Sequence, residues 1–260
     1  IQNVLIGGLA GDALTDADHN VVLGTNALGS DVRGSRSTAI GHGALFTQNF
    51  TSDTNSHNTA VGYQAGTAIT TGLNNTLIGA QAGDALTDAD NNVAIGLQAL
   101  STDTLGSRTV AIGQGALENQ NFTTATNTFN VAVGFQAATS LTTGVQNTIV
   151  GGRAGDALVD ANYNVAVGEQ ALTTDTEGNR SVAVGFGALA LQNFTTSTDV
   201  YNTAVGSSAG VSITTGINNT LIGALAGDAL TDADQNVAVG MNALASDTLG
   251  SKSVAIGEGA

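Results

Sequence analysis

The stretch N-V-A-I-G-L-Q-A, from Asn92 to Ala99, decides the fold of this chain, because variants of it recur fifteen times. Its glycine stands at Gly7, Gly24, Gly41, Gly62, Gly79, Gly96, Gly113, Gly134, Gly151, Gly168, Gly185, Gly206, Gly223, Gly240 and Gly257. Most successive glycines of this set are separated by the same number of residues as Gly79 and Gly96. Three of the intervals, the first from Gly41 to Gly62, are longer by four residues. Three short units and one long unit therefore form a superperiod, such as the span from Gly7 to Gly79.

Each unit has the pattern of one short strand followed by a turn. The residue before the glycine is always Ile, Val or Leu, and Val or Thr stands two residues earlier, so these two share one face of a strand. A smaller residue, usually Ala, lies between them and points to the opposite face. The short unit has too few residues for a propeller blade, a helical hairpin or a leucine-rich repeat. The sequence therefore predicts an all-β fold, a parallel β-solenoid or β-roll of about 15 coils.

The composition limits the classes of partner. The chain has 260 residues, with 35 Gly and no Pro, Cys or Trp, so its core must be built from aliphatic residues and Ala. The 21 acidic and 6 basic residues give a formal net charge of −15, which repels nucleic acid and anionic lipid. No stretch reaches the ~20 apolar residues of a spanning helix, so we expect no membrane insertion by this segment. Because the chain begins at Ile1 without Met, we expect residues 1–260 to be a single solenoid segment of a longer fibrous protein.

A single stack of such coils is expected to be only marginally stable. Ordering the backbone costs about 1–2 kcal/mol per residue, whereas each buried aliphatic side chain returns only ~1.5–3 kcal/mol. Contact between chains would supply more burial. We therefore expect a homo-oligomer, a homotrimer by the resemblance described next, in which the Ala-rich strand face, with Ala94, Ala111, Ala132 and Ala166, is buried between chains.

Two units resemble a known family. The strings S-V-A-V-G-F-G-A, from Ser181 to Ala188, and S-V-A-I-G-E-G-A, from Ser253 to Ala260, resemble the head repeat of YadA-type trimeric autotransporter adhesins. The resemblance implies a left-handed parallel β-roll, three chains around a threefold axis and an extracellular location. The string N-T-A-V-G-Y-Q-A, from Asn58 to Ala65, is also similar to repeats in phage tail-fibre proteins.

The titratable residues do not form a repeated catalytic set. The three histidines are His19, His42 and His57, and their equivalents in the next superperiod are Asn91, Gln114 and Phe129. An enzyme needs a convergent group of titratable side chains around a cleft, and a narrow solenoid has little room for one. We therefore expect a protein that is not an enzyme and has no cofactor.

Two charged patterns recur and each has an ordinary explanation. The string G-D-A-L-T-D-A-D, first seen from Gly11 to Asp18, offers three carboxylates to Ca²⁺, or else acidic side chains that cap local backbone. A base stands five residues before every fourth repeat glycine and five residues after an Asp, as in the pair Asp31 and Arg36. The spacing favours an ion pair across a turn, which contributes about 0–1 kcal/mol when exposed.

The three long units carry the candidate binding residues. Each contains the motif L-x-x-Q-N-F-T, and its four extra residues are expected to bulge from one corner of the coil. The candidate residues are Asn49, Phe50, Asn121, Phe122, Asn193 and Phe194. Four coils advance ~19 Å along the axis, so the bulges would form a row with that spacing. They act either as plain spacer loops or as contact points for a ligand, since recognition usually resides in loops on a rigid scaffold.

These features together predict a non-enzymatic extracellular fibre segment that is structural and adhesive and attaches to a surface or host. The alternatives are the shaft of a phage tail fibre and a purely structural extracellular filament. We expect the chain to associate with itself, and the sequence does not choose among a host-surface, matrix or glycan ligand. The expected location is extracellular, on a cell surface or a virion surface.

Overall fold

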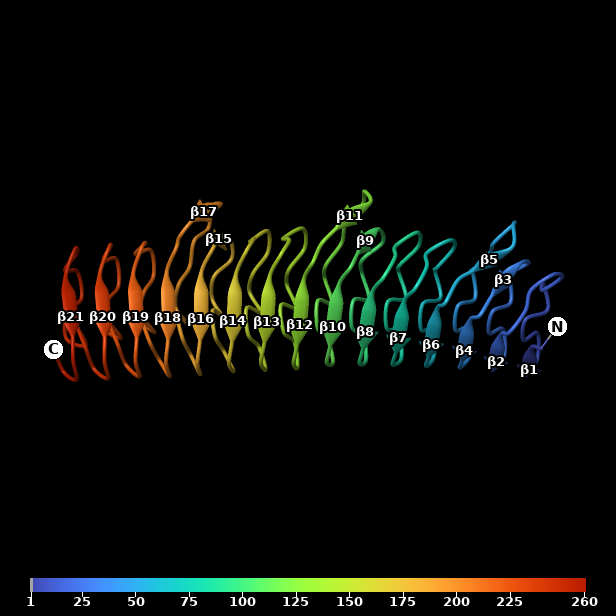
Figure 1. Ribbon diagram of the computed structural model, residues 1–260, viewed down its shortest axis with the longest axis horizontal. Coiled ribbons are helices and arrows are strands. Elements are labelled where there is room, and N and C mark those ends of the chain that lie inside the picture. The colour runs from blue at the N-terminus through green and yellow to red at the C-terminus, as the bar shows by residue number, and fades with distance from the viewer. Residues whose placement is uncertain (1) are drawn as a thin grey trace. The chain divides into compact units, whose positions relative to one another are not determined.

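The computed structural model describes residues 2–260 and confirms an all-β parallel β-solenoid of about 15 coils. The chain divides into two compact units, which we describe separately: unit 1 runs to Phe129 and unit 2 runs from Asn130 to Ala260. Within each unit the strands of successive coils lie side by side (Figure 1). Residues 2–260 contain no helix of the length and apolar character needed to cross a membrane.

Unit 1 has one main sheet and two short ladders. The main sheet consists of β1 (Val4–Ile6), β2 (Val21–Leu23), β4 (Thr38–Ile40), β6 (Thr59–Val61), β7 (Thr76–Ile78), β8 (Val93–Ile95) and β10 (Val110–Ile112). The short ladders pair β3 (Gly34–Ser35) with β5 (Thr54–Asn55) and β9 (Gly106–Ser107) with β11 (Thr126–Asn127). All pairs are parallel and keep the repeat in register, so that Ala94 lies opposite Ala111.

Unit 2 repeats this arrangement. Its main sheet consists of β12 (Val131–Val133), β13 (Thr148–Val150), β14 (Val165–Val167), β16 (Val182–Val184), β18 (Thr203–Val205), β19 (Thr220–Ile222), β20 (Val237–Val239) and β21 (Val254–Ile256). One short ladder pairs β15 (Gly178–Asn179) with β17 (Thr198–Asp199). The long unit that ends at Gly206 leaves the register intact, because Ala183 lies opposite Ala204.

The Ala-rich strand face lies inside the coil of its own chain. Ala94, Ala111, Ala132 and Ala166 are fully buried although the structure contains a single chain, so the prediction that this face is buried between chains is wrong. The physical reason is the narrow width of the short coil, in which Ala94 shares the interior with Leu100 of the turn. Leu77, at the same strand position one coil earlier, is also buried, and the turn there carries Gly83, where a Cβ would lie 2.8 Å from Leu77 Cδ2. The outward side of the strands carries the Val, Thr, Ile and Leu residues instead, and these remain partly exposed.

Asparagines form a buried column that joins successive coils. The backbone N–H of Asn75 donates to Oδ1 of Asn58 at 2.9 Å, and that of Asn92 donates to Oδ1 of Asn75 at 2.9 Å. The side-chain amide of Asn75 also donates to the carbonyl oxygen of Ala89 in the next coil at 2.8 Å. The side chain of Asn75 thus satisfies two backbone groups of the next coil, the N–H of Asn92 and the carbonyl oxygen of Ala89. A buried polar group that is hydrogen-bonded avoids the penalty of an unsatisfied one.

The glycine that ends each strand is required by close stacking of the backbone. Gly96 has a φ of +135°, a conformation that residues with a Cβ rarely adopt. A Cβ on Gly96 would lie 2.5 Å from the carbonyl oxygen of Gly113 in the next coil. Both effects recur along the column, so the strand can turn at this point only where the side chain is absent.

This geometry predicts a severe cost for Gly96→Ala. Strained φ and overpacking each cost about 1–3 kcal/mol, so we expect the variant to lose about 2–6 kcal/mol of unfolding free energy. Urea denaturation followed by circular dichroism measures the loss. The matched control is Gly152→Ala, because a Cβ there meets nothing closer than 4.0 Å and the φ is not positive. Equal stability of the two variants would contradict the proposed role of the glycine column.

Candidate functional site

The three long units place their recurring motif inward and their extra residues outward. As far as Phe50, the backbone of the long coil pairs with the preceding coil residue by residue, as a short coil does. The carbonyl oxygen of Phe50 accepts from the N–H of Arg33 at 3.0 Å. Residues 51–53, 123–125 and 195–197 are exposed and form the projecting loops. In unit 1, the loops that lead into β5 and β11 project from the same edge (Figure 1).

The candidate binding residues are therefore split between surface and interior. Phe50, Phe122 and Phe194 are only 6 %, 7 % and 8 % exposed, so these rings lie against the coil and do not project into solvent. The ring of Phe50 packs over Gly34, where a Cβ would come within 2.8 Å of its Cδ2. Each Phe thus closes the interior of its coil.

The asparagines of the same motif remain accessible. Asn49 is exposed, whereas Asn121 and Asn193 are half-buried, and Oδ1 of Asn121 accepts from the hydroxyl of Thr104 at 3.3 Å. A binding role for these residues, or for the exposed loop that follows them, stays a prediction.

The buried end of the motif belongs to a polar network that the sequence analysis missed. The side-chain amide of Gln48 donates to Oδ2 of Asp31 at 2.6 Å and to the hydroxyl of Ser37 at 2.9 Å, while its Oε1 accepts from Asn58 at 2.9 Å. Oδ1 of Asp31 accepts from the backbone N–H groups of Gly34 and Phe50 at 2.9 and 3.1 Å. Asp31 and Gln48 are fully buried.

The ion pairs that we expected between Asp31 and Arg36, and at the equivalent positions, are wrong. Asp31, Asp103 and Asp175 point into the core and are bonded there, so they lie away from the bases five residues later. A signal for this was present in the sequence, since the Gln of a long unit stands one coil after each of these aspartates, as Gln48 does after Asp31.

Two of these bases, Arg108 and Arg180, instead stack on aromatic rings of neighbouring coils, and Nε of Arg36 donates to Oδ1 of Asn55 at 3.0 Å. The guanidinium of Arg180 lies between the rings of Tyr163 and Tyr201, at 4.7 and 5.8 Å from their centroids, and its Nε donates to Asp199 at 3.1 Å. In unit 1 the guanidinium of Arg108 lies 5.8 Å from the ring centroid of Phe129. These contacts are exposed and each contributes about 0.5–1 kcal/mol.

In the turns with the G-D-A-L-T-D-A-D motif, the carboxylates bond to separate partners and do not converge on one point. Oδ1 of Asp88 accepts from the hydroxyl of Thr71 at 2.5 Å, and Oδ1 of Asp90 accepts from the backbone N–H of Leu73 at 2.7 Å. Oδ1 of Asp84 is buried and has no hydrogen-bond partner within residues 2–260, and burial raises the pKa of this carboxyl above its ordinary value. Over the same residues, no three His, Asp or Glu side chains converge as a metal site would require.

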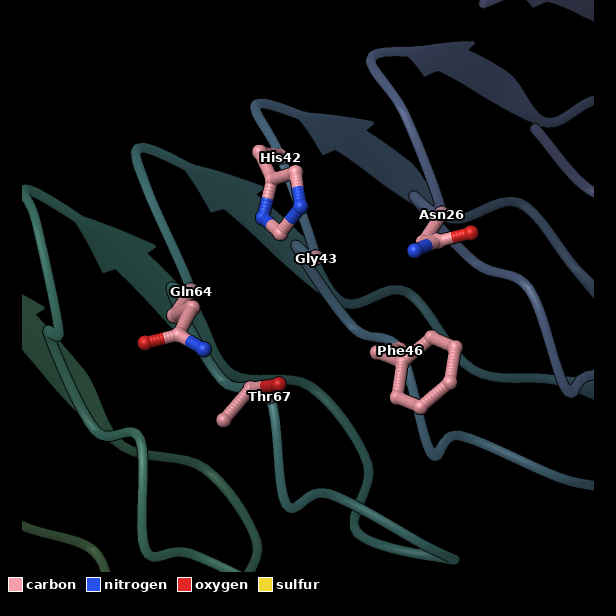
Figure 2. Close-up of a pocket in the computed structure, with 6 residues that line it drawn as sticks. All are labelled: Asn26, His42, Gly43, Phe46, Gln64 and Thr67. Carbon is pink, nitrogen blue, oxygen red and sulfur yellow. The ribbon is translucent and has the colours of Figure 1, made fainter. Parts of the chain in front are cut away.

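A hollow on the surface of unit 1 is the site with the most varied chemistry. It measures about 160 Å³ and is lined by Asn26, His42, Gly43, Phe46, Gln64 and Thr67 (Figure 2). These residues come from three successive coils, on the turn that follows the strand-ending glycine. The imidazole of His42 stacks on the ring of Tyr63, with centroids 5.6 Å apart and planes inclined by 17°.

A missing side chain creates the hollow. Two residues after the repeat glycine, the chain adopts a left-handed conformation, with φ of +57° at Asn26, +67° at Gly43 and +54° at Gln64. Asn26 and Gln64 project from the outer two coils, whereas Gly43 leaves the middle coil without a side chain. The backbone of Gly43 forms the floor, and the amides of its neighbours form two of the walls (Figure 2).

Comparison of the chain with protein-family models, with curated proteins and with solved structures finds no match. The fold therefore rests on the repeat and on the structure itself.

The buried network predicts that Asp31→Asn destabilises the chain. Both carboxylate oxygens of Asp31 accept hydrogen bonds, so an amide nitrogen in either position would face a donor. A buried donor left without a partner costs about 1–3 kcal/mol, and we expect a loss of that size in urea denaturation. The control is Asp247→Asn, because Asp247 is partly exposed and the structure gives it one bond, from the N–H of Gly250. The interpretation fails if both variants lose the same stability.

The buried Oδ1 of Asp84, which has no hydrogen-bond partner within residues 2–260, predicts a pH-dependent gain in stability from Asp84→Asn. Because folding raises the pKa of Asp84, the contribution of this carboxyl to the free energy of unfolding is most favourable below its ordinary pKa of 3.8. That contribution is lost as the pH rises through the folded-state pKa. The variant should therefore melt at a higher temperature than the parent at pH 7, and the difference should vanish below pH 3.8. Asp156→Asn is the control, because Asp156 accepts a bond from Thr173 and should gain nothing. A gain that persists at low pH would contradict the electrostatic cause.

Proposed function

We propose that the chain is a structural and adhesive segment of an extracellular fibre, without enzymatic activity, whose copies associate along the outward face of their strands. The observation that carries the proposal is the composition of that face. In each of the fifteen strands the two outward residues are Val, Ile, Leu or Thr, and none is charged. Soluble monomeric proteins rarely expose a continuous apolar surface of this kind.

Exposure of these side chains supports the same conclusion. In unit 1, Ile6, Leu23 and Ile78 are 57 %, 45 % and 38 % exposed, and in unit 2 Ile222 is 40 % exposed. Because the strands of each sheet are in register, the outward side chains form two columns that run from coil to coil. Adjacent strands are ~4.8 Å apart, so the columns make a flat and closely spaced apolar surface.

Charge favours a second copy of this chain as the partner on this face. Two chains with a net charge of −15 each repel one another wherever their acidic turns meet. The strand face is the part of the surface where identical copies can touch without opposing carboxylates. The repeat resembles that of YadA-type heads, in which three chains surround an axis, and we propose a homotrimer for this chain as well.

Attachment to a host or other surface is the adhesive part of the proposal. It is supported by the same resemblance and by the projecting loops at residues 51–53, 123–125 and 195–197. Such a segment acts outside the cell, on a cell or virion surface. An assembly that forms normally but binds no cell surface, matrix protein or glycan would favour the alternatives of a tail-fibre shaft or a purely structural filament.

The association is tested with the double variant Ile78→Lys and Ile95→Lys. Two buried ammonium groups at an apolar contact are strongly unfavourable, so we expect the parent to sediment as a trimer and the variant to lose at least about tenfold in affinity. Analytical ultracentrifugation with light scattering measures the mass. The matched control is Asn74→Lys with Asn91→Lys, which places the same charges on the same two coils, at a position where Arg36 and Lys252 stand in other coils.

Two results would contradict the proposal. One is a parent chain that is folded and monomeric at concentrations where the assembly is expected. The other is equal dissociation of the two double variants, which would show that added charge alone, and not its place on the strand face, weakens association.

A further inference from the structure

The fold of the coil does not require the aromatic side chains at the hollow around Gly43. At the equivalent positions of the next superperiod, His42, Phe46 and Tyr63 are replaced by Gln114, Glu118 and Phe135, and in the one after that by Phe186, Ala190 and Ser207. The coils of the later superperiods form the same strands with these replacements. The combination of imidazole and phenyl in the lining, with the ring of Tyr63 stacked on the imidazole, therefore occurs once in the chain and is not a requirement of the fold.

The lining combines aromatic faces with amides and a hydroxyl. Phe46 is 40 % exposed, so its ring presents a face to solvent, and the imidazole of His42 is held by stacking on Tyr63, which lies outside the lining. Asn26 and Gln64 each offer a carbonyl acceptor and an NH₂ donor, and Thr67 offers a hydroxyl. In ligand sites, a small number of polar groups placed around an apolar surface fixes the orientation of the ligand.

The charges around this hollow favour a neutral ligand over an ionic one. None of the six residues that line it is Asp, Glu, Lys or Arg. An anionic ligand would find no Lys or Arg there, only the imidazole of His42, and would be repelled by the net charge of −15, while a cationic ligand would find no carboxylate in the lining. The lining therefore suits a neutral ligand, with an apolar face for the rings and several hydroxyl groups for the amides.

Size limits the ligand to one ring. The volume of about 160 Å³ is below the ~300–1,000 Å³ of sites that enclose drug-sized molecules. A pyranose ring fits this description, because its C–H face is apolar and its rim carries hydroxyl groups. We propose that the hollow around Gly43 is a subsite for one neutral sugar residue of a glycan, an inference that rests on the adhesive part of the proposed function and names its ligand class.

The subsite can be filled without altering the coil. Gln occupies the position of Gly43 in several other coils, with a φ of +57° at Gln81 and Gln98, so the backbone accepts it there. Gly43→Gln would place an amide side chain where the sugar is expected. The control is Gly187→Gln, which makes the same change at the equivalent position of unit 2, where Phe186 and Ala190 replace His42 and Phe46.

The experiment is saturation-transfer NMR with the methyl glycosides of galactose, glucose and mannose, and with glucuronate as a charged probe. We expect transfer to the C–H face of at least one methyl glycoside, at least tenfold weaker transfer with Gly43→Gln, and parent-like transfer with Gly187→Gln. Phe46→Thr, which installs the residue found in the next coil as Thr67, should weaken transfer about tenfold and serves if Gly43→Gln fails to fold. Glucuronate should give less transfer than the neutral probes.

Three outcomes would overturn the subsite: no transfer to any neutral glycoside, equal transfer with the parent and with both Gly43→Gln and Phe46→Thr, or preferential transfer to glucuronate. The proposed fibre is judged separately by the mass of the assembly and by attachment of the whole segment to surfaces. A trimer of the Gly43→Gln variant that attaches normally would leave the fibre and its adhesion standing and remove only this subsite.

Discussion

The close approach of backbones at the strand-ending glycine is the constraint on which the rest of the structure depends. The carbonyl oxygen of Gly113 occupies the space where Gly96 would carry a Cβ, so neighbouring coils meet here through main chain alone. The contact holds the following turn in place, which brings the next Ala and Leu into the interior. The spacing of the whole repeat follows from it, because a coil that began to turn earlier or later would carry a side chain into its neighbour.

The sequence predicted the number of coils, their parallel register and the strand positions, because the glycine column is visible as a strict period. It did not predict which strand face is inward. The triplet V-A-I is compatible with either face as the core, and the answer depends on the width of the coil, which is a property of three dimensions. Ala94 is inward together with Leu100 of the turn, whereas one coil earlier Leu77 is inward and the turn carries Gly83, so strand and turn residues share one narrow interior.

Among the candidate sites, residue spacing was a poor guide to contact. Asp31 lies five residues from Arg36 in sequence, yet it bonds to Gln48, which is far away along the chain and directly adjacent in the next coil. In a solenoid the nearest neighbours are one coil apart, so a search for pairs at that separation would have found the network. The hollow around Gly43 had a similar signal, a Gly flanked one coil away on either side by Asn26 and Gln64.

The buried Asp31–Gln48 pair has a consequence for how the repeats find their order. Most of the short coils are interchangeable, so a growing stack could accept the wrong neighbour with little loss of apolar contact. A coil with the buried Asp fits only before a long unit that brings Gln, because any other neighbour would leave the carboxylate without its amide. The pair therefore works as a register mark once in each superperiod, and it makes a misaligned nascent stack less stable than the correct one.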